Sequence, residues 1–169
     1  MSMMSIRAAT PRDREAISLV EEHAFGQQTE AGLVDALVSS GETVVELVAE
    51  DEGQVVGHIL FSRLFVTRGG KKFAAVALAP LAVEPSFHGA GIGGALIREA
   101  HLRLRQAGEK LSVVLGDPAY YGRFGYSHER AAKFESDYQC DALQAQAWEE
   151  APETGRLVYA PAFGSALAA

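Results

Sequence analysis

The chain has 169 residues, of which 48% are hydrophobic and 22% are charged, and its net charge is −7. These values are those of one ordinary globular domain, and they exclude a disordered chain. The excess of acidic residues argues against a protein that binds the phosphate backbone of nucleic acids, whose affinity comes from Lys and Arg. A cationic substrate such as an amine is compatible with this charge. We expect a single domain over residues 1–169, without a nucleic-acid partner.

The sequence favours a reducing compartment and gives no sign of a membrane segment. The longest nearly unbroken apolar run, residues 74–83, falls short of the about 20 residues that cross a bilayer, and it contains Pro80. The N-terminal residues lack the basic stretch and apolar run of a secretory signal. The single cysteine, Cys140, cannot form an internal disulfide. We therefore expect a cytoplasmic protein with no membrane partner.

The first half of the chain predicts a strand, two helices and antiparallel hairpins. Residues 5–9 have β-forming character, and the Thr-Pro pair at residues 10–11 is typical of a helix start. A second helix begins near Thr29 and ends at Gly41. Three segments rich in Val, Ile, Leu and Phe follow and read as strands, at residues 44–50, 54–66 and 73–83. The third reads as a strand buried on both faces, and its Pro80 predicts a bulge or local splay.

The second half predicts a strand–helix–strand unit. The longest helix spans residues 91–107 and presents one apolar stripe, made by Ile92, Leu96, Ala100 and Leu104. A short apolar strand follows at residues 111–115, and Asp117 then caps a short helix that Gly125 ends. A final strand near residues 157–159 lies in a less regular C-terminal third. The order of elements is that of a mixed α/β fold.

Glycine is in excess, and its distribution points to an anion site. Four of the 17 glycines lie between Gly89 and Gly94, where the third β segment leads into the longest helix. Backbone N–H groups at the start of a helix lack internal partners, and glycines let a phosphate approach them closely. The spacing matches neither the dinucleotide fingerprint nor the P-loop. The local pattern therefore predicts a phosphate site of another kind.

Two motifs resemble those of the Gcn5-related N-acetyltransferase (GNAT) family. Residues 88–93 read His-Gly-Ala-Gly-Ile-Gly and follow a Val-Glu-Pro turn that starts at Val83, which is similar to the family's acetyl-CoA motif, Gln/Arg-x-x-Gly-x-Gly/Ala. Residues 121–126 read Tyr-Gly-Arg-Phe-Gly-Tyr and resemble its Tyr-x-x-x-Gly-Phe segment. The residues just before them look like a subgroup of bacterial predicted N-acetyltransferases. The resemblance covers residues 1–126 well and residues 127–169 loosely.

The resemblance implies a GNAT-like α/β fold, in which helices flank a mostly antiparallel sheet that splays at its fourth strand. It implies that acetyl-CoA is the co-substrate and that the acetyl group passes directly to an amine of a small molecule or peptide. Family members often dimerise, so a homodimer is a further expectation. The residues that the resemblance places against the cofactor are Leu81, Ala82, Val83, His88, Gly89, Ala90, Gly91, Ile92, Gly93, Gly94, Asp117, Tyr120 and Phe124.

For the chemistry, the resemblance assigns Tyr121 as the acid that protonates the departing thiolate, since a phenol is protonated at neutral pH. Its neighbour Tyr120 is the competing candidate. The sequence does not determine which group acts as the base. His58 is one candidate, because it lies in a β segment that could line the cleft and an imidazole titrates in the right range. The others are a water chain, the turn residue Glu84, and the first-helix residues Glu21, Glu22 and His23.

Several alternatives stay open beside this hypothesis. Asp117 is either the cap of a short helix or a direct contact of the cofactor, and the cap explains it fully. Cys140 has no partner that would make it a nucleophile, and no cluster of His, Asp or Glu has metal-ligand spacing, so we expect no metal. The alternative function is a non-catalytic sensor or interaction module that binds acyl-CoA on the same fold.

Overall fold

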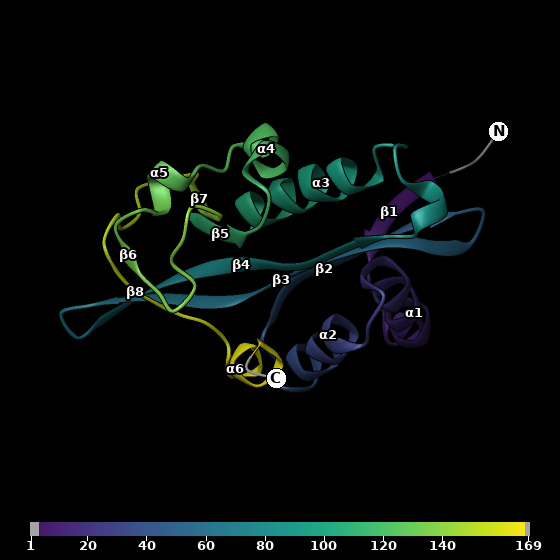
Figure 1. The fold of residues 1–169 in the computed structure, drawn as a ribbon, viewed down its shortest axis with the longest axis horizontal. Helices are drawn as coiled ribbons and strands as arrows, with labels where there is room; N and C mark the ends of the chain where they lie inside the picture. Colours follow the sequence, from purple (N-terminus) through teal and green to yellow (C-terminus); the bar gives the residue numbers. More distant parts are fainter. Residues whose placement is uncertain (1–3, 168–169) are drawn as a thin grey trace.

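The structure, a computed structural model, describes residues 4–167. An eight-stranded mixed sheet forms the centre of this part of the chain (Figure 1). Its main path runs β1-β2-β3-β4-β5-β7, and β8 pairs with both β3 and β6. Neighbouring strands are antiparallel except for the parallel pairs β4–β5 and β6–β8. The expected α/β fold with a mostly antiparallel sheet is therefore confirmed. The strands are β1 (Met4–Ala8), β2 (Thr43–Asp51), β3 (Gln54–Arg68), β4 (Lys71–Val83), β5 (Leu111–Leu115), β6 (Phe134–Glu135), β7 (Leu143–Ala147) and β8 (Gly155–Val158).

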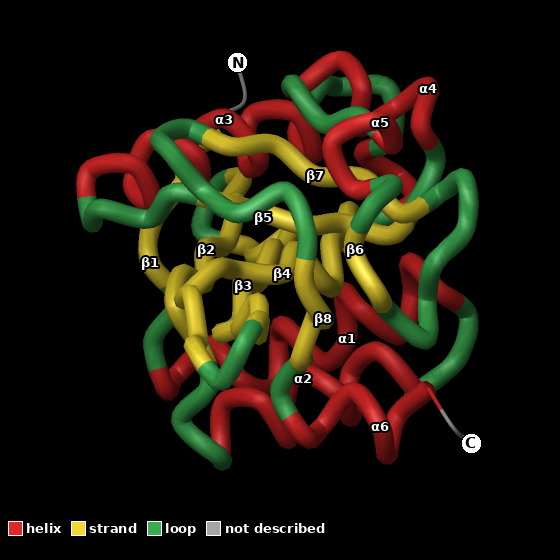
Figure 2. Tube along the Cα trace, turned by 90° about the vertical axis from the view of Figure 1, so that its left-hand side faces the viewer, coloured by secondary structure: helices red, strands yellow, loops and turns green. Residues whose placement is uncertain are grey.

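Helices cover both faces of this sheet. The end-on view shows α3, α4 and α5 on one side of the strands and α1, α2 and α6 on the other (Figure 2). Within residues 4–167, no helix has the length and apolar character needed to span a membrane. The helices are α1 (Arg14–Phe25), α2 (Thr29–Ser39), α3 (Ile92–Gln106), α4 (Pro118–Tyr121), α5 (His128–Ala131) and α6 (Pro161–Leu167).

The apolar stripe of α3 packs on one face of the sheet, as its spacing predicts. Ile92, Leu96, Ala100 and Leu104 are all buried. A Cβ placed on Gly57 of β3 would lie 3.0 Å from side-chain atoms of both Ile92 and Leu96, so this strand has a glycine where the helix approaches it closely. Burying a leucine side chain contributes about 1.5–3 kcal/mol, so this stripe holds the start of α3 firmly against the sheet.

The sheet splays where β4 and β5 separate. β4 pairs with β3 as far as Val83, with a break in register opposite residues 79–80. On its other edge, β4 pairs with β5 only from Val76 to Leu78. In the described part of the chain, no strand is registered against that edge over residues 79–83. The disruption predicted at Pro80 is thus confirmed, and it leaves a row of free backbone groups beside a gap in the sheet.

Two expectations need correction. β4 is not buried on both faces, because Ala79, Leu81 and Val83 are half-exposed where the sheet opens. The C-terminal third is also more regular than expected. The strand near residues 157–159 ends at Val158 and is followed by α6, and the segments before it form α5, β6 and β7.

Candidate functional site

Two cavities meet at the splay between β4 and β5. The first has a volume of about 640 Å³ and lies between the end of β4 and the start of α3. The second has a volume of about 420 Å³ and lies between the separated strands, α2 and the C-terminal segment. Phe25 at the end of α1 and Leu81 on the free edge of β4 line both cavities. The two cavities therefore adjoin each other at the free edge of β4.

The glycine-rich segment forms the wall of the first cavity. Gly89 and Gly91 have φ angles of 85° and 79°, a left-handed conformation that favours glycine. Gly93 and Gly94 stand in the first turn of α3 and line the cavity without side chains. The N–H groups of this turn have no carbonyl partners within the helix, and the helix dipole is positive here. The turn thus combines bare backbone with free N–H groups, the two features from which the glycine pattern predicts an anion site.

His88 closes this loop onto the strand before it. Its Nε2 lies 2.9 Å from the carbonyl oxygen of Val83. Because a carbonyl only accepts hydrogen bonds, Nε2 carries a proton and donates it. In the neutral imidazole the other ring nitrogen is then an acceptor, so His88 donates to an anion only in its protonated form. The ring therefore links the loop to the end of β4, whatever the charge of a bound group.

The first cavity is lined by all of the expected cofactor-binding residues except Ala90, Asp117 and Phe124. The ring of Phe124 is buried beneath the start of α3 instead, close to Gly94. Asp117 lines the second cavity. Its Oδ1 accepts a hydrogen bond of 2.9 Å from the N–H of Ala119, so the predicted role as the cap of α4 is confirmed.

Two arginines in the first cavity were not foreseen from the sequence. The guanidinium groups of Arg98 and Arg123 lie over the rings of Phe124 and Tyr120, at 5.1 and 5.6 Å from the ring centroids. Both arginines line the cavity, and none of its described lining residues is acidic. The sequence does contain one signal for Arg98. It follows Gly94 by four residues, which puts both residues on the same face of α3.

The neighbouring tyrosines face different cavities. Tyr120 lines the first cavity and Tyr121 the second, with their rings edge to face at 5.0 Å. Burial raises the pKa of the Tyr121 phenol to about 12, so the group keeps its proton at neutral pH. Its ring lies directly over Gly116, where a Cβ would come within 2.5 Å of Tyr121 Cε2. Tyr121 thus keeps its phenol proton and lies beside the splay.

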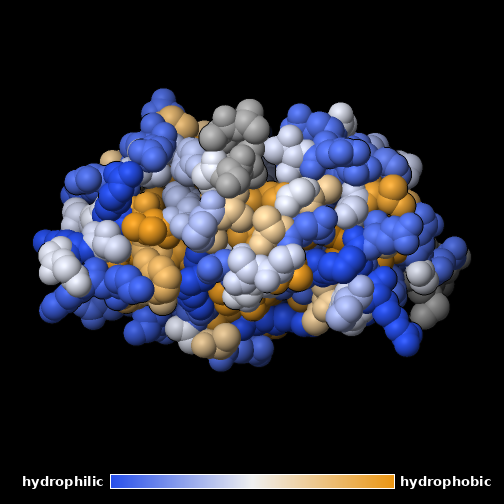
Figure 3. All heavy atoms as spheres, turned by 90° about the horizontal axis from the view of Figure 1, so that it is seen from below, coloured by the Kyte–Doolittle hydropathy of each residue, from blue (hydrophilic) through white to orange (hydrophobic). Residues whose placement is uncertain are grey.

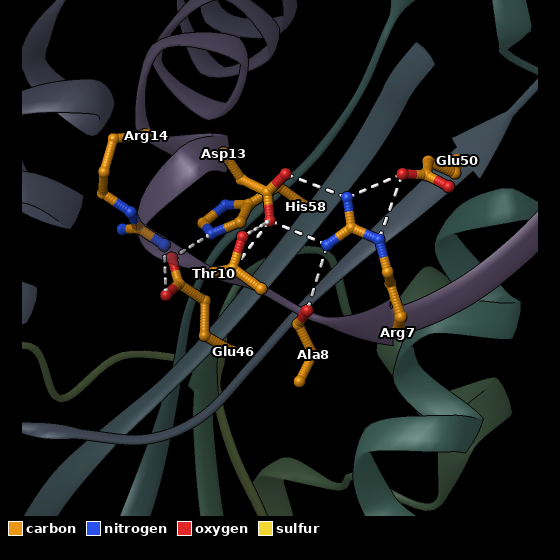
Figure 4. Close-up of polar contacts among 8 residues, drawn as sticks. All are labelled: Arg7, Ala8, Thr10, Asp13, Arg14, Glu46, Glu50 and His58. Atoms are coloured by element: carbon orange, nitrogen blue, oxygen red, sulfur yellow. Dashed lines mark hydrogen bonds and ion pairs between the residues drawn. The ribbon is translucent and has the colours of Figure 1, made fainter. Parts of the chain in front are cut away.

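The structure corrects the expectation that His58 faces the cleft. Its side chain is fully buried between α1 and the sheet, and it lies in neither cavity. Nδ1 lies 2.7 Å from Glu21 Oε2, and Nε2 lies 2.7 Å from Glu46 Oε2. Glu46 also pairs with Arg14 at 2.6 Å (Figure 4). His58 therefore belongs to a buried network of charges that joins α1 to two strands.

Three of the other candidate bases have partners of their own. Glu84 pairs with Nδ1 of the exposed His23 at 2.7 Å, which ties the end of β4 to α1. The Glu21 carboxylate is buried against His58, and the Cys140 side chain is exposed. Within the described residues, no group of three or more His, Cys, Asp or Glu side chains could hold a metal ion.

Comparison with known proteins gives consistent matches. Residues 5–128 match the family model described as an acetyltransferase (GNAT) domain. An Escherichia coli K12 protein named uncharacterized N-acetyltransferase YhbS is 39% identical over 124 residues, which are 73% of each chain. A second protein of that strain, named uncharacterized N-acetyltransferase YjhQ, is 42% identical over 118 residues, 68% of this chain and 64% of its own length.

Solved structures agree over nearly the whole chain. A GNAT family acetyltransferase from Brucella melitensis, crystallised in complex with acetyl-CoA, is 37% identical with a TM-score of 0.81. That match covers 95% of this chain and 98% of the other. The Escherichia coli YhbS protein, crystallised in complex with CoA, is 30% identical with a TM-score of 0.89. This match covers 97% of this chain and 93% of the other.

Proposed function

The chain belongs to the GNAT acetyltransferase family, and from this membership we propose that it transfers the acetyl group of acetyl-CoA to an amine at the splay between β4 and β5. The observation that carries the proposal is the unpaired edge of β4 over residues 79–83. This edge joins a phosphate-type cavity at the start of α3 to the cavity that holds the Tyr121 phenol.

The residues present fit the cofactor. The N–H groups of the first turn of α3 would bind the pyrophosphate, because bare glycines let it approach the backbone. Arg98 and Arg123 add positive charge to the same cavity, where a phosphate is held by charge-assisted hydrogen bonds. The free edge of β4 from Leu81 to Val83 would accept the amide groups of the pantetheine arm, as an added strand pairs with an open edge.

Acetyl-CoA supplies the thioester whose C–S bond breaks as the new C–N bond forms. Backbone N–H groups on the free edge of β4 face the gap and would stabilise the negative charge that develops on the carbonyl oxygen. Tyr121 would donate its proton to the leaving sulfur and later regain one from solvent. The proton that the reacting amine loses passes to solvent through the open second cavity.

The proposal also includes the acceptor of the acetyl group and the cellular compartment in which the reaction takes place. The acceptor is an amine of a small molecule or peptide, since the second cavity opens beside the proposed reacting groups. A cytoplasmic place of action is supported by the single, exposed cysteine, which gives the chain no internal disulfide to form in an oxidising compartment.

Two measurements on the purified chain test the proposal. Thermal unfolding with acetyl-CoA, CoA, ATP or NAD should show stabilisation by the first two ligands only, because binding to the folded state raises its stability. Release of CoA thiol should then depend on an added amine. Stabilisation by ATP or NAD but not CoA would contradict the cofactor site. Binding of CoA with no thiol release for any amine would favour a non-catalytic sensor instead.

A further inference from the structure

The two cavities carry opposite charges. Arg98 and Arg123 line the first cavity, and its described lining residues include no carboxylate. Glu30 and Asp117 line the second, and no Lys, Arg or His stands among its described lining residues. The charged groups are thus segregated on the two sides of the splay. An anionic molecule is favoured on one side and a cationic one on the other, since complementary charge selects partners.

Apart from these two carboxylates, the wall of the second cavity is mostly apolar and aromatic. Leu33, Leu78, Val113, Tyr138, Tyr159 and Phe163 line it. At its volume of about 420 Å³ it is near the small end of the range for pockets that hold small molecules. Such a wall favours a compact apolar body over a long polar chain, because polar groups buried here would lose their hydrogen bonds to water.

The cavity also has large apolar side chains left open to solvent. Phe25 and Leu115 both line it, and they are 43% and 47% exposed. On the face that carries α1, α2 and α6, apolar residues reach the surface between hydrophilic ones (Figure 3). These two side chains therefore extend the apolar wall of the cavity to the protein surface.

Glu30 is placed to receive a positive charge. It lies in the first turn of α2 and is half-buried. Its only hydrogen bonds within the described residues come from the amide of Gln27, at 3.0 and 3.3 Å. Asp117 is engaged as the cap of α4. Since Asp117 is exposed and Glu30 is half-buried, Glu30 is the carboxylate of this cavity whose attraction for an ammonium group is less screened by water.

The geometry points to an acceptor of one chemical class: a primary amine on a compact aromatic or branched aliphatic body, held by its ammonium group at Glu30 and by its apolar part against the cavity wall. The same nitrogen gives its proton to solvent before it attacks the thioester. This inference rests on the proposed acetyltransferase function and narrows it. It disfavours polyamines, whose long charged chain does not match the apolar wall, and amino acids, whose carboxylate meets Glu30 and Asp117.

The test compares amines that differ in one feature. Thiol release from acetyl-CoA is measured with 2-phenylethylamine, with phenylalanine as the same body plus a carboxylate, and with spermidine. We expect kcat/KM for 2-phenylethylamine to exceed that for the other two by at least about tenfold, which corresponds to about 1.4 kcal/mol. Higher kcat/KM for spermidine or phenylalanine would overturn the acceptor class and leave the acetyltransferase function standing.

Two variants on the same helix test the carboxylate. Glu30→Gln should raise KM for 2-phenylethylamine about tenfold and leave KM for acetyl-CoA unchanged. Asp35→Asn is the matched control, because Asp35 is an exposed carboxylate of α2 that lines neither cavity, and both KM values should stay as in the wild type. An unchanged KM in Glu30→Gln would overturn the assignment.

A binding measurement separates this inference from the function on which it rests. Calorimetry of 2-phenylethylamine with the CoA-saturated protein should show binding in the wild type and Asp35→Asn, and at least about tenfold weaker binding in Glu30→Gln. This result needs no turnover, so it stands even if the chain transfers no acetyl group. No binding to the CoA-saturated wild type would overturn the acceptor class, and no binding of CoA itself would overturn the proposed function.

Discussion

Tyr120 and Tyr121 are adjacent in the sequence, but their side chains face different cavities. α4 turns the first side chain toward the cavity with the arginines and the second toward the cavity with Glu30. Only Tyr121 therefore lies on the side where an amine would approach. The family resemblance identifies the same tyrosine, and its role as the acid stays a prediction.

Replacing Tyr121 by Phe should lower kcat by a factor of about 10²–10⁴, the usual contribution of a positioned acid. KM for acetyl-CoA should change little, since Tyr121 does not line the first cavity. Tyr120→Phe should instead act mainly on KM for acetyl-CoA. Because burial raises the pKa of Tyr121 to about 12, the loss in kcat should be constant from pH 6 to pH 10. Steady-state kinetics across that range checks it, and an unchanged kcat would remove the assignment.

Gly116 is predicted to hold the ring of Tyr121 in place. A Cβ at this position would lie 2.5 Å from Tyr121 Cε2, so the ring or the backbone must shift. Gly116→Ala should lower kcat about tenfold or more through this displacement, with acetyl-CoA affinity kept and stability reduced by about 1–3 kcal/mol. Gly122→Ala is the matched control, because a Cβ there meets nothing within 4 Å. Equal kinetics for the two variants would contradict the positioning role.

The residues that sequence reasoning misplaced are those whose partners come from packing. His58 meets Glu21 only after α1 docks on the sheet, and no local spacing encodes that contact. Glycine positions were predictable, because a left-handed φ or a close approach limits the choice of residue locally. Arg98 lay between the two cases, since its helical spacing from Gly94 was visible but the cavity beside it was not.

At the scale of elements, β4 and α3 were predictable nearly to their ends, because a long apolar strand and a four-residue stripe are strong local signals. α5 and β6 are too short to show a period. β7 could not be predicted from the sequence for a different reason. Its Gln144 is buried and donates to the carbonyls of Gly116 and Ala142, so a strand of the central sheet carries a polar residue inside.

The start of α3 is predicted to bind phosphate through its arginine as well as its backbone. Arg98→Gln should weaken acetyl-CoA binding by about 5–20-fold, near the lower end of the effect of one charge-assisted hydrogen bond, because Arg98 is exposed to solvent. The affinity that remains should depend less on salt, because one ion pair is gone. Arg105→Gln is the control, since Arg105 is exposed on α3 and does not line the cavity. Calorimetry at two ionic strengths checks both, and identical affinities would contradict the role.

At the scale of the whole molecule, a network of charges ties the N-terminal elements to the sheet. Arg7 of β1 bridges Asp13 and Glu50, and this bridge holds the pKa of Asp13 well below its usual range. Figure 4 shows this bridge beside the one in which Arg14 and His58 meet at Glu46. The two bridges link β1, α1, β2 and β3, so α1, which lines the first cavity at its far end, is anchored at its start.

His58 makes the stability of this anchor depend on pH. Both ring nitrogens lie 2.7 Å from carboxylate oxygens, and a neutral imidazole has only one N–H. The buried triad of His58, Glu21 and Glu46 therefore holds one proton more than a neutral imidazole and two ionised carboxylates would carry. Burial alone would lower the pKa of His58, but the two carboxylates outweigh it and raise that pKa above the ordinary 6.5. The stabilisation is fully present below pH 6.5 and is lost as pH rises toward the folded-state pKa.

The free energy of unfolding of the wild type should therefore fall above about pH 6.5, by up to about 1.4 kcal/mol per pH unit, since folding takes up one proton. His58→Gln should be less stable by about 3–5 kcal/mol at pH 6, because two buried carboxylates lose their cation, and its stability should fall less steeply from pH 7 to pH 9. Urea unfolding across this range measures both. His101→Gln is the control: burial lowers the pKa of His101 to about 4, so the ring is neutral in the folded state, and above pH 7 an ordinary histidine is mostly neutral in the unfolded state as well. Its loss should therefore leave the slope from pH 7 to pH 9 nearly unchanged. A wild-type slope equal to that of His58→Gln would mean that the triad binds no extra proton, and the anchor of α1 would then not depend on pH.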